Sequence, residues 1–253
     1  MQMTQLVPKL GRNDIRLIGR DSFLVFMFLF ALAIALILRV GLPALNTYFA
    51  GHGVLPNATI STSLSDLYPM LVAFFALFDG ALLVGAVFGF VLLDEKDDNT
   101  IKAMLVTPVP LRLYVIYRVA LPAFLAAFVI ITMLLLINQA LLPVWQLCLL
   151  AAGASLTASI TALAFATFAE NKVQGFALSK FGGIAGWAIL IGWFIAEPWQ
   201  WLIGLFPPFW VSKAYWMALD GRELWWAALA AGVVLQMGLV WLLVQRFNRV
   251  VYR

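Results

Sequence analysis

Long apolar runs separated by short polar stretches account for most of the chain. Six of them are long enough to cross the hydrocarbon core of a bilayer, which takes about 20 helical residues. These runs cover residues 23–45, 68–93, 113–137, 144–169, 177–196 and 224–245. Backbone groups in lipid must satisfy one another, and the alternation typical of a membrane β-barrel is missing from the sequence. We therefore predict an all-α integral membrane protein with six transmembrane helices.

Lysine and arginine gather on alternate sides of these runs, and this bias predicts the orientation. One side carries Lys9, Arg12, Arg16, Arg20, Lys96, Lys102, Arg112, Arg118, Lys172, Lys180, Arg246, Arg249 and Arg253. On the other side, the loops 46–67 and 138–143 contain neither residue type, and the last loop contains only Lys213 and Arg222. We expect both termini in the cytoplasm and the chain in the inner membrane of a bacterium.

Residues 5–20 precede the first apolar run as a separate element. Basic residues recur there at spacings of three and four positions, while leucines occupy another face. This pattern predicts an interfacial helix that lies on the cytoplasmic membrane surface and contacts lipids. A disordered basic tail is the alternative.

The apolar segment 197–222 is broken by turn-forming residues. Its adjacent prolines, Pro207 and Pro208, interrupt a helix. We predict one or two half-helices that enter the outer leaflet as a re-entrant segment, covered by protein, with Pro207, Pro208 and Trp210 as a candidate outer gate. The tryptophans of the segment suit the headgroup level of a bilayer; they are Trp199, Trp201, Trp210 and Trp216.

Composition agrees with the membrane assignment. Hydrophobic residues make up 64% of the chain and charged residues 11%, against about 45–50% and 25% in soluble domains. The net charge of +4 lies mostly at the ends of the apolar runs, so it favours membrane lipids rather than nucleic acid. The single cysteine, Cys148, excludes a disulfide within the chain, and we expect it to be a small core residue.

The loop 94–110 between the second and third runs is more than a connector. It begins acidic, turns at Asp98-Asn99 and continues with an amphipathic stretch. Thr100 can cap a short helix there, and Pro108 ends it. Its apolar side carries Ile101, Met104 and Leu105. A short helix with an exposed apolar edge is typical of a docking site for a partner protein, although a helix packed on the membrane is an alternative.

The order of residues in this loop resembles a known family. Glu-x-x-x-Gly-Thr, a short apolar helix and Thr-Pro-Val describe the membrane subunits of type-2 ABC exporters. The matching residues are Glu95, Thr100, Leu105, Thr107, Pro108 and Val109. Asn99 stands where the family usually has Gly, and Asn also tolerates the left-handed conformation. Because the N-terminal helix and the broken segment fit as well, the resemblance covers nearly the whole chain.

The resemblance implies that the loop is a coupling helix contacting a separate ABC ATPase subunit. The implied contact residues are Glu95, Asp98, Thr100, Ile101, Met104, Leu105, Thr107 and Pro108. The sequence has no G-x-x-x-x-G-K-[ST] motif, so we expect no cofactor in this chain, with ATP and Mg²⁺ bound by the partner. Six helices are half of such a transporter, which implies a second permease copy or a paralogue. Apolar, aromatic composition favours an amphipathic cargo such as a drug, an antibiotic or a lipid.

Two charged residues, Arg39 and Asp79, lie deeper within the predicted spans than Arg118 and Lys180, which lie near span ends. Arg39 and Asp79 differ in depth by about 7 Å at 1.5 Å per residue, so they either form an ion pair that locks two helices or belong to the substrate path. The sequence offers no set of catalytic residues. A non-transporting membrane scaffold and an intramembrane enzyme remain the alternative functions.

Overall fold

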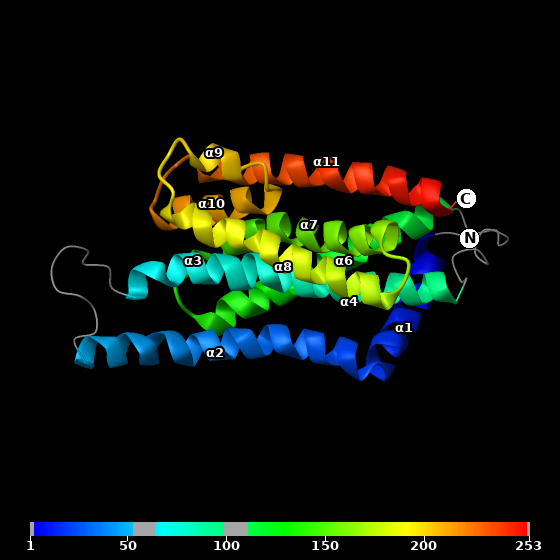
Figure 1. Cartoon of the computed structure of the whole chain (residues 1–253), viewed down its shortest axis with the longest axis horizontal. Helices are drawn as coiled ribbons and strands as arrows, with labels where there is room; N and C mark the ends of the chain where they lie inside the picture. The colour runs from blue at the N-terminus through cyan, green and yellow to red at the C-terminus, as the bar shows by residue number, and fades with distance from the viewer. Residues whose placement is uncertain (1–2, 53–63, 99–110, 252–253) are drawn as a thin grey trace.

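The computed structural model describes residues 3–52, 64–98 and 111–251. Within these ranges the protein is a bundle of long helices that run roughly side by side, with both chain ends at the same end of the bundle (Figure 1). The helices are α1 (Met3–Arg20), α2 (Ser22–His52), α3 (Tyr68–Val72), α4 (Gly80–Asp97), α6 (Leu111–Ile137), α7 (Val144–Phe168), α8 (Lys172–Phe194), α9 (Gln200–Ile203), α10 (Pro207–Leu219) and α11 (Trp225–Val251). The short helix η1 (Leu64–Leu67) precedes α3, and the π-helix η2 (Ala73–Asp79) joins α3 to α4. Together these four elements form one continuous span.

Six helical segments are long and apolar enough to cross a membrane, which confirms the predicted all-α, six-span architecture. They are Ser22–Phe49, Leu64–Asp97, Leu113–Ile137, Val144–Phe168, Lys172–Phe194 and Trp225–Arg249. Each contains most of one predicted span. The protein is therefore a multi-pass membrane protein, and the shared position of its two ends fits an even number of crossings.

Polar caps decide where two of the helices begin. Asp21 separates α1 from α2, because its side chain accepts hydrogen bonds from the backbone N–H groups of Phe23 and Leu24 at 2.9 and 3.4 Å. Helix α1 thus turns across the end of the bundle (Figure 1), the direction expected of an interfacial helix. Helix α8 begins five residues before the predicted span, because the Asn171 side chain accepts from the Gln174 backbone N–H at 3.0 Å.

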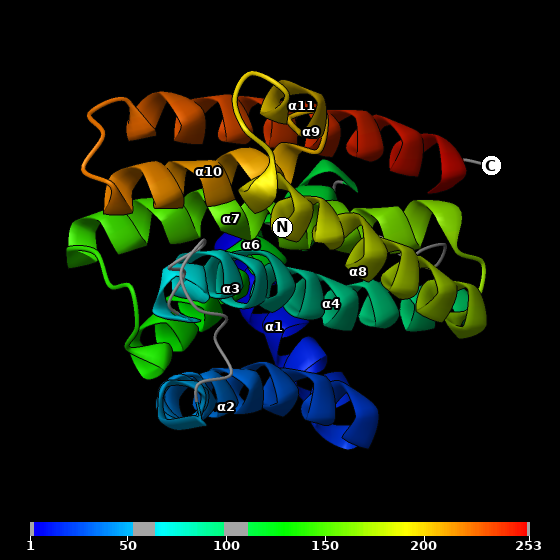
Figure 2. The ribbon, with the colours of Figure 1, turned by 60° about the vertical axis from the view of Figure 1, so that its left-hand side comes forward.

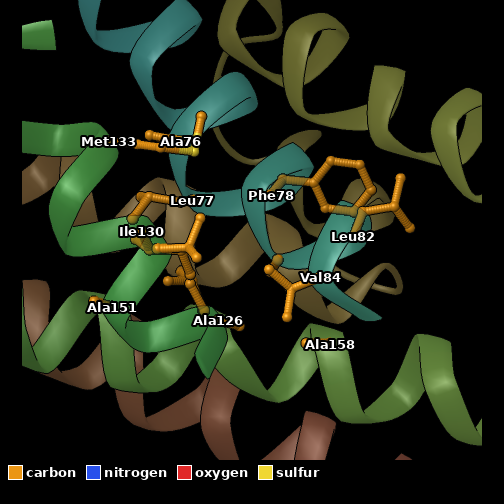
Figure 3. Packing of buried hydrophobic residues seen from close by; sticks show 14 of the residues in the cluster. Ala76, Leu77, Phe78, Leu82, Val84, Ala126, Ile130, Met133, Ala151 and Ala158 are labelled. Carbon is orange, nitrogen blue, oxygen red and sulfur yellow. The ribbon is translucent and has the colours of Figure 1, made fainter. Parts of the chain in front are cut away.

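The core forms where α4 and α7 pack against each other at the centre of the bundle. Gly85 allows this approach, since a Cβ there would lie 2.6 Å from the carbonyl oxygen of Ala158. Figure 3 shows the apolar side chains that surround the contact, with Val84 of α4 facing the same region as Ala126 of α6 and Ala158 of α7. Most residues of α4 are buried, and α4 and α7 form the centre of the bundle: α6 packs against both helices, whereas α10 and α11 pack against α7.

Buried hydroxyls on α7 join it to neighbouring helices. The Thr157 hydroxyl donates to the Gln236 side chain of α11 at 2.9 Å, and Gln236 in turn donates to the Gly153 carbonyl at 3.2 Å. The Ser159 hydroxyl donates to the Val119 carbonyl of α6 at 2.7 Å. The small polar residues of α7 therefore serve helix packing.

Helix α10 forms the middle part of the segment 197–222, and its re-entrant position in the membrane stays a prediction. Its two prolines occupy the first helical turn, where a missing N–H costs nothing. With 13 residues it is about 20 Å long, short of the ~30 Å hydrocarbon core. Figure 2 shows α10 between α7 and α11, and most of its residues are buried, as a non-spanning helix at membrane depth requires.

Two side chains lie elsewhere than predicted. Cys148 is exposed on α7 rather than buried in the core, because it points away from α4 and α6. Trp216 is only 7% exposed, and its ring N–H donates to the Pro69 carbonyl at 3.1 Å. It is a core residue joining α10 to α3, while Trp199 and Trp201 remain exposed.

The close approach of α4 and α7 predicts opposite effects for two glycine substitutions. Gly85→Ala should lower the melting temperature by about 3 °C or more, because overpacking costs about 1–3 kcal/mol. Gly183→Ala on α8 meets nothing within 4 Å, so the better helix propensity of alanine should leave stability unchanged or raise it. Thermal unfolding of the detergent-solubilised protein measures both. Equal changes in melting temperature for the two variants would contradict the close packing at Gly85.

Candidate functional site: a buried ionic cluster beside the loop 99–110

Five polar side chains from three helices meet at the end of the bundle that holds the chain termini. Asp14 comes from α1, Glu95 from the last turn of α4, and Tyr114, Tyr117 and Arg118 from the first turns of α6. We refer to these five residues as the ionic cluster. The loop 99–110 connects α4 to α6, so the cluster lies where both ends of that loop enter the bundle.

Arg118 is the centre of the ionic cluster. Its Nη1 donates to both carboxylate oxygens of Asp14 at 3.0 Å, and its Nη2 forms an ion pair with Glu95. The Tyr114 hydroxyl donates to Glu95 Oε2 at 2.6 Å, and the Tyr117 hydroxyl donates to Asp14 Oδ2 at 2.7 Å. The planar guanidinium fork suits two carboxylates at once, which the compact ammonium of lysine cannot match.

All three charges of the cluster are buried: Arg118, Asp14 and Glu95 are 1%, 2% and 4% exposed. Charges removed from water are tolerated only when they are paired and hydrogen-bonded. The guanidinium carbon also lies 5.3 and 5.5 Å from the ring centres of Tyr114 and Tyr117, within range of cation–π attraction. The cluster therefore fixes α1, α4 and α6 to one another at this end.

Glu95 is 4% exposed, and its direct contact with an ATPase subunit stays a prediction. Its carboxylate points inward to Arg118 instead of outward from the loop. Asp98 caps the end of α4 and is exposed, so it is available to a partner. The other predicted contact residues, Thr100, Ile101, Met104, Leu105, Thr107 and Pro108, lie outside the described residues, and their role stays a prediction.

Sequence reasoning missed four of the five members of the cluster: Asp14, Tyr114, Tyr117 and Arg118. Arg118 was grouped with the charges flanking the spans, yet it lies inside the apolar run that α6 forms. Asp14 is the acidic residue within an otherwise basic helix. The sequence offered two signals, namely Arg118 inside an apolar run and Asp14 among basic residues. Nothing in the sequence indicates that these two residues, 104 positions apart, form a pair.

A second, more exposed set of contacts ties the same end of the bundle together. Lys172 at the start of α8 pairs with Asp94 at 2.8 Å and lies 3.7 Å from Asp21. The Lys96 ammonium donates to the Ala169 carbonyl at 2.9 Å. Because Lys172 is 44% exposed, its pairs are worth less than the buried ones.

The two intramembrane charges do not form the ion pair considered from the sequence. Arg39 donates through Nη1 to the Leu136 carbonyl of α6 at 3.2 Å, and within the described ranges no ion pair joins it to Asp79. Asp79 is the last residue of the π-helix η2 and is half-buried, with no hydrogen-bond or ion-pair partner in the described part of the chain. π-Helical turns inside α-helices frequently mark functional sites.

The candidate outer-gate residues begin and stabilise α10. Pro208 is buried, and the Trp210 ring N–H donates to the Gly204 carbonyl at 2.8 Å. Trp210 also contacts the ring of Trp201 at a centroid distance of 5.2 Å. These contacts position the turn between α9 and α10, and a gating role stays a prediction.

The fold defines a six-span, all-α integral membrane protein in which the ionic cluster joins α1, α4 and α6 at one end of the bundle. Comparison with known proteins narrows this class. Residues 14–244 match the family described as "Fluoroquinolones export permease protein Rv2686c-like". The chain therefore belongs to this family of export permeases.

Two curated relatives carry the same description. The fluoroquinolones export permease proteins Rv2686c and MT2760, from Mycobacterium tuberculosis strains ATCC 25618 / H37Rv and CDC 1551 / Oshkosh, are each 34% identical to this chain over 243 residues. The matches cover 94% of this chain and 92% of each relative. No solved structure shows a significant match.

The cluster predicts a large cost for removing its cation. Arg118→Met leaves two buried carboxylates without a counter-charge, and breaking a buried pair in this way costs about 3–5 kcal/mol. The melting temperature in detergent should fall by about 6 °C or more. The matched control is Lys172→Met, whose half-exposed pairs contribute at most about 1 kcal/mol. If the two variants have the same melting temperature, the cluster does not stabilise this end of the bundle.

Proposed function

We propose that this chain is the membrane subunit of an ATP-driven exporter that moves amphipathic drugs out of the cytoplasm. The observation that carries the proposal is the match to export permeases along residues 14–244, nearly the whole chain. Fluoroquinolones are the first cargo to test, because the curated relatives are named for their export. A separate ATPase subunit binds ATP and Mg²⁺, and a second permease copy or paralogue completes the membrane part.

The orientation follows from the distribution of lysine and arginine. The end of the bundle with both termini, the ionic cluster and the loop 99–110 faces the cytoplasm, where the ATPase is found. The opposite end, with α9 and α10, faces outward. We propose that the chain lies in the inner membrane of a bacterial cell, with both termini in the cytoplasm.

Coupling runs through both ends of the loop 99–110. The ATPase contacts the loop at Asp98 and beyond, and its movement displaces the ends of α4 and α6. Because Arg118 holds Glu95 and Asp14 together, α4, α6 and α1 move as one body. Glu95 is thus a positioning residue that acts through Arg118, and the amphipathic helix α1 takes part in the movement.

Asp79 is the candidate cargo-binding residue within the membrane. Its carboxylate is half-buried and has no hydrogen-bond or ion-pair partner among the described residues, and an intramembrane charge marks a substrate path by default. Many fluoroquinolones carry a basic amine, whose ammonium form can pair with a carboxylate. The neighbouring rings of Phe74 and Phe75, 4.9 Å apart, add an aromatic surface suited to a planar drug.

Coupling and docking can be separated by two variants. Glu95→Gln keeps the shape of the side chain but removes one charge from the ionic cluster, so ATP-dependent export should fall about tenfold while the ATPase still co-purifies. Met104→Arg places a charge on the apolar side of the predicted docking helix, so the ATPase should no longer co-purify. Uptake of a fluorescent fluoroquinolone into inside-out membrane vesicles measures export.

The exposed residue Lys180 on α8 provides a control for both variants, because Lys180→Gln changes a surface charge away from the loop. Export and co-purification should both stay as in the unaltered protein. Full ATP-dependent export by Glu95→Gln would contradict its positioning role. A stoichiometric ATPase on Met104→Arg would contradict docking through the loop.

The role of Asp79 predicts selectivity among drugs. Asp79→Asn should raise the KM for fluoroquinolones with a basic amine about tenfold, since a charge-assisted hydrogen bond is worth roughly 1.5–3 kcal/mol. Analogues without the amine should be exported with little change, and Asp79→Glu should restore amine selectivity. An equal loss for both kinds of drug would assign Asp79 a structural role instead.

A further inference from the structure

A groove of about 1150 Å³ runs between α10 and α11 at the end of the bundle opposite the chain termini. Figures 1 and 2 show these two helices side by side, with α9 beside them. Neither Asp79 nor any residue of the ionic cluster lines this groove. One wall is apolar, its inner part is aromatic, and its mouth carries charges of both signs.

The apolar wall has the length of one bilayer leaflet. It follows α11 from Leu224 to Leu235, which is about 16 Å at 1.5 Å per residue, and half of a ~30 Å hydrocarbon core is about 15 Å. Leu224 and Val234 are 62% and 68% exposed, so the groove opens sideways to the bilayer. Between them small residues, including Ala227 and Ala231, leave room for a chain against the helix.

Two tryptophans from α9 and α10 line the inner part of the groove. The rings of Trp201 and Trp210 meet edge to face, with centroids 5.2 Å apart. The hydrogen bond from Trp210 to the Gly204 carbonyl holds this pair in place. Trp210 also packs close to Gly232 of α11, where a Cβ would lie 3.0 Å from the Trp210 Cβ. The aromatic surface is therefore rigid before any ligand enters.

The Lys213 charge at the mouth of the groove already forms an ion pair within the protein. Lys213 is 9% exposed, and its ammonium pairs with Glu197 at 2.8 Å and donates to Gln200 at 2.9 Å. The same ammonium, through a hydrogen bond, holds the pKa of the Glu197 carboxyl below its ordinary value. This pair closes the side of the groove and is not available to a ligand.

Arg222 and Glu223 offer the charges that remain. Arg222 contacts Asp220 through Nε alone, at 3.7 Å, so its two Nη groups can donate to an anion. The exposed Glu223 carboxylate has no hydrogen-bond or ion-pair partner in the described part of the chain. A guanidinium fork suits phosphate, and a neighbouring carboxylate suits an ammonium group. Adjacent opposite charges at the mouth match a zwitterion.

We propose that the groove binds one phospholipid with a zwitterionic headgroup that carries a primary amine. The phosphate lies at Arg222, the ammonium group lies at Glu223, and one acyl chain follows the alanine wall to the tryptophan pair. A drug fits less well, because drug pockets measure about 300–1,000 Å³ and enclose most of the ligand. This groove is larger, open along its side and as long as a leaflet.

The test uses the full-length protein in nanodiscs with a phosphatidylethanolamine that carries a photoactivatable group on one acyl chain. No ATP or ATPase subunit is present, so the result does not depend on the proposed transport function. Crosslinks mapped by mass spectrometry should concentrate on residues 224–235, and unlabelled phosphatidylethanolamine should compete for them. Phosphatidylglycerol, which lacks the ammonium group, should compete at least fivefold more weakly.

Substitutions distinguish lipid bound in the groove from lipid that contacts other exposed helix surfaces. Ala231→Trp fills the groove and should reduce labelling of 224–235 at least fivefold, and Ala231→Leu should reduce it less. Met237→Trp is the matched control, because Met237 is exposed on the same helix outside the groove lining. Glu223→Gln should abolish the preference for phosphatidylethanolamine over phosphatidylglycerol.

Four results would overturn the proposal. Labelling spread evenly over the exposed helices, or unchanged by Ala231→Trp, would mean bulk lipid contact. Equal competition by the two phospholipids would remove the assigned headgroup. Displacement of the label by a fluoroquinolone would assign the groove to a drug.

Discussion

The pairing of one buried guanidinium with two buried carboxylates holds the end of the bundle next to the loop 99–110. Arg118, Asp14 and Glu95 come from α6, α1 and α4, which meet in no other comparably polar contact among the described residues. A buried ion pair contributes little to stability compared with apolar packing, but losing one partner is costly. The cluster therefore specifies that α1, α4 and α6 meet, at the end of the bundle where the loop 99–110 connects α4 to α6.

The rest of the bundle is arranged around α4 and α7. Glycines on α4 and small residues on α7 let the two backbones come close, as at Gly85, where an added Cβ would lie 2.6 Å from the Ala158 carbonyl oxygen. In a membrane the hydrophobic effect gives little drive for helices to associate, so close packing and hydrogen bonds between helices supply it. A tightly packed centre and more exposed outer helices, α2, α8 and α11, follow from this.

Membership of an export permease family and the geometry of the two bundle ends suggest a division of labour. At the end with the termini, the ionic cluster joins the helices that flank the loop. In the span that begins at η1, a π-helix ends at the carboxylate of Asp79. At the opposite end, α10 lies between α7 and α11 and lines a groove against α11. A force received at one end would thus pass along α4 to the depth of Asp79.

The sequence by itself determined the spans, the separation of residues 5–20 from the first span and the broken segment around Pro207. Each of these depends on local properties, namely hydropathy, proline chemistry and residue order, which neighbouring helices do not change. The tertiary structure alone decided which face of each helix is buried. It turned Glu95 inward to Arg118, gave Arg39 a backbone carbonyl of α6 as its partner, exposed Cys148 and buried Trp216. In a chain this apolar, the lipid-facing and core-facing sides of a helix look alike in sequence, so only the packing of distant helices distinguishes them.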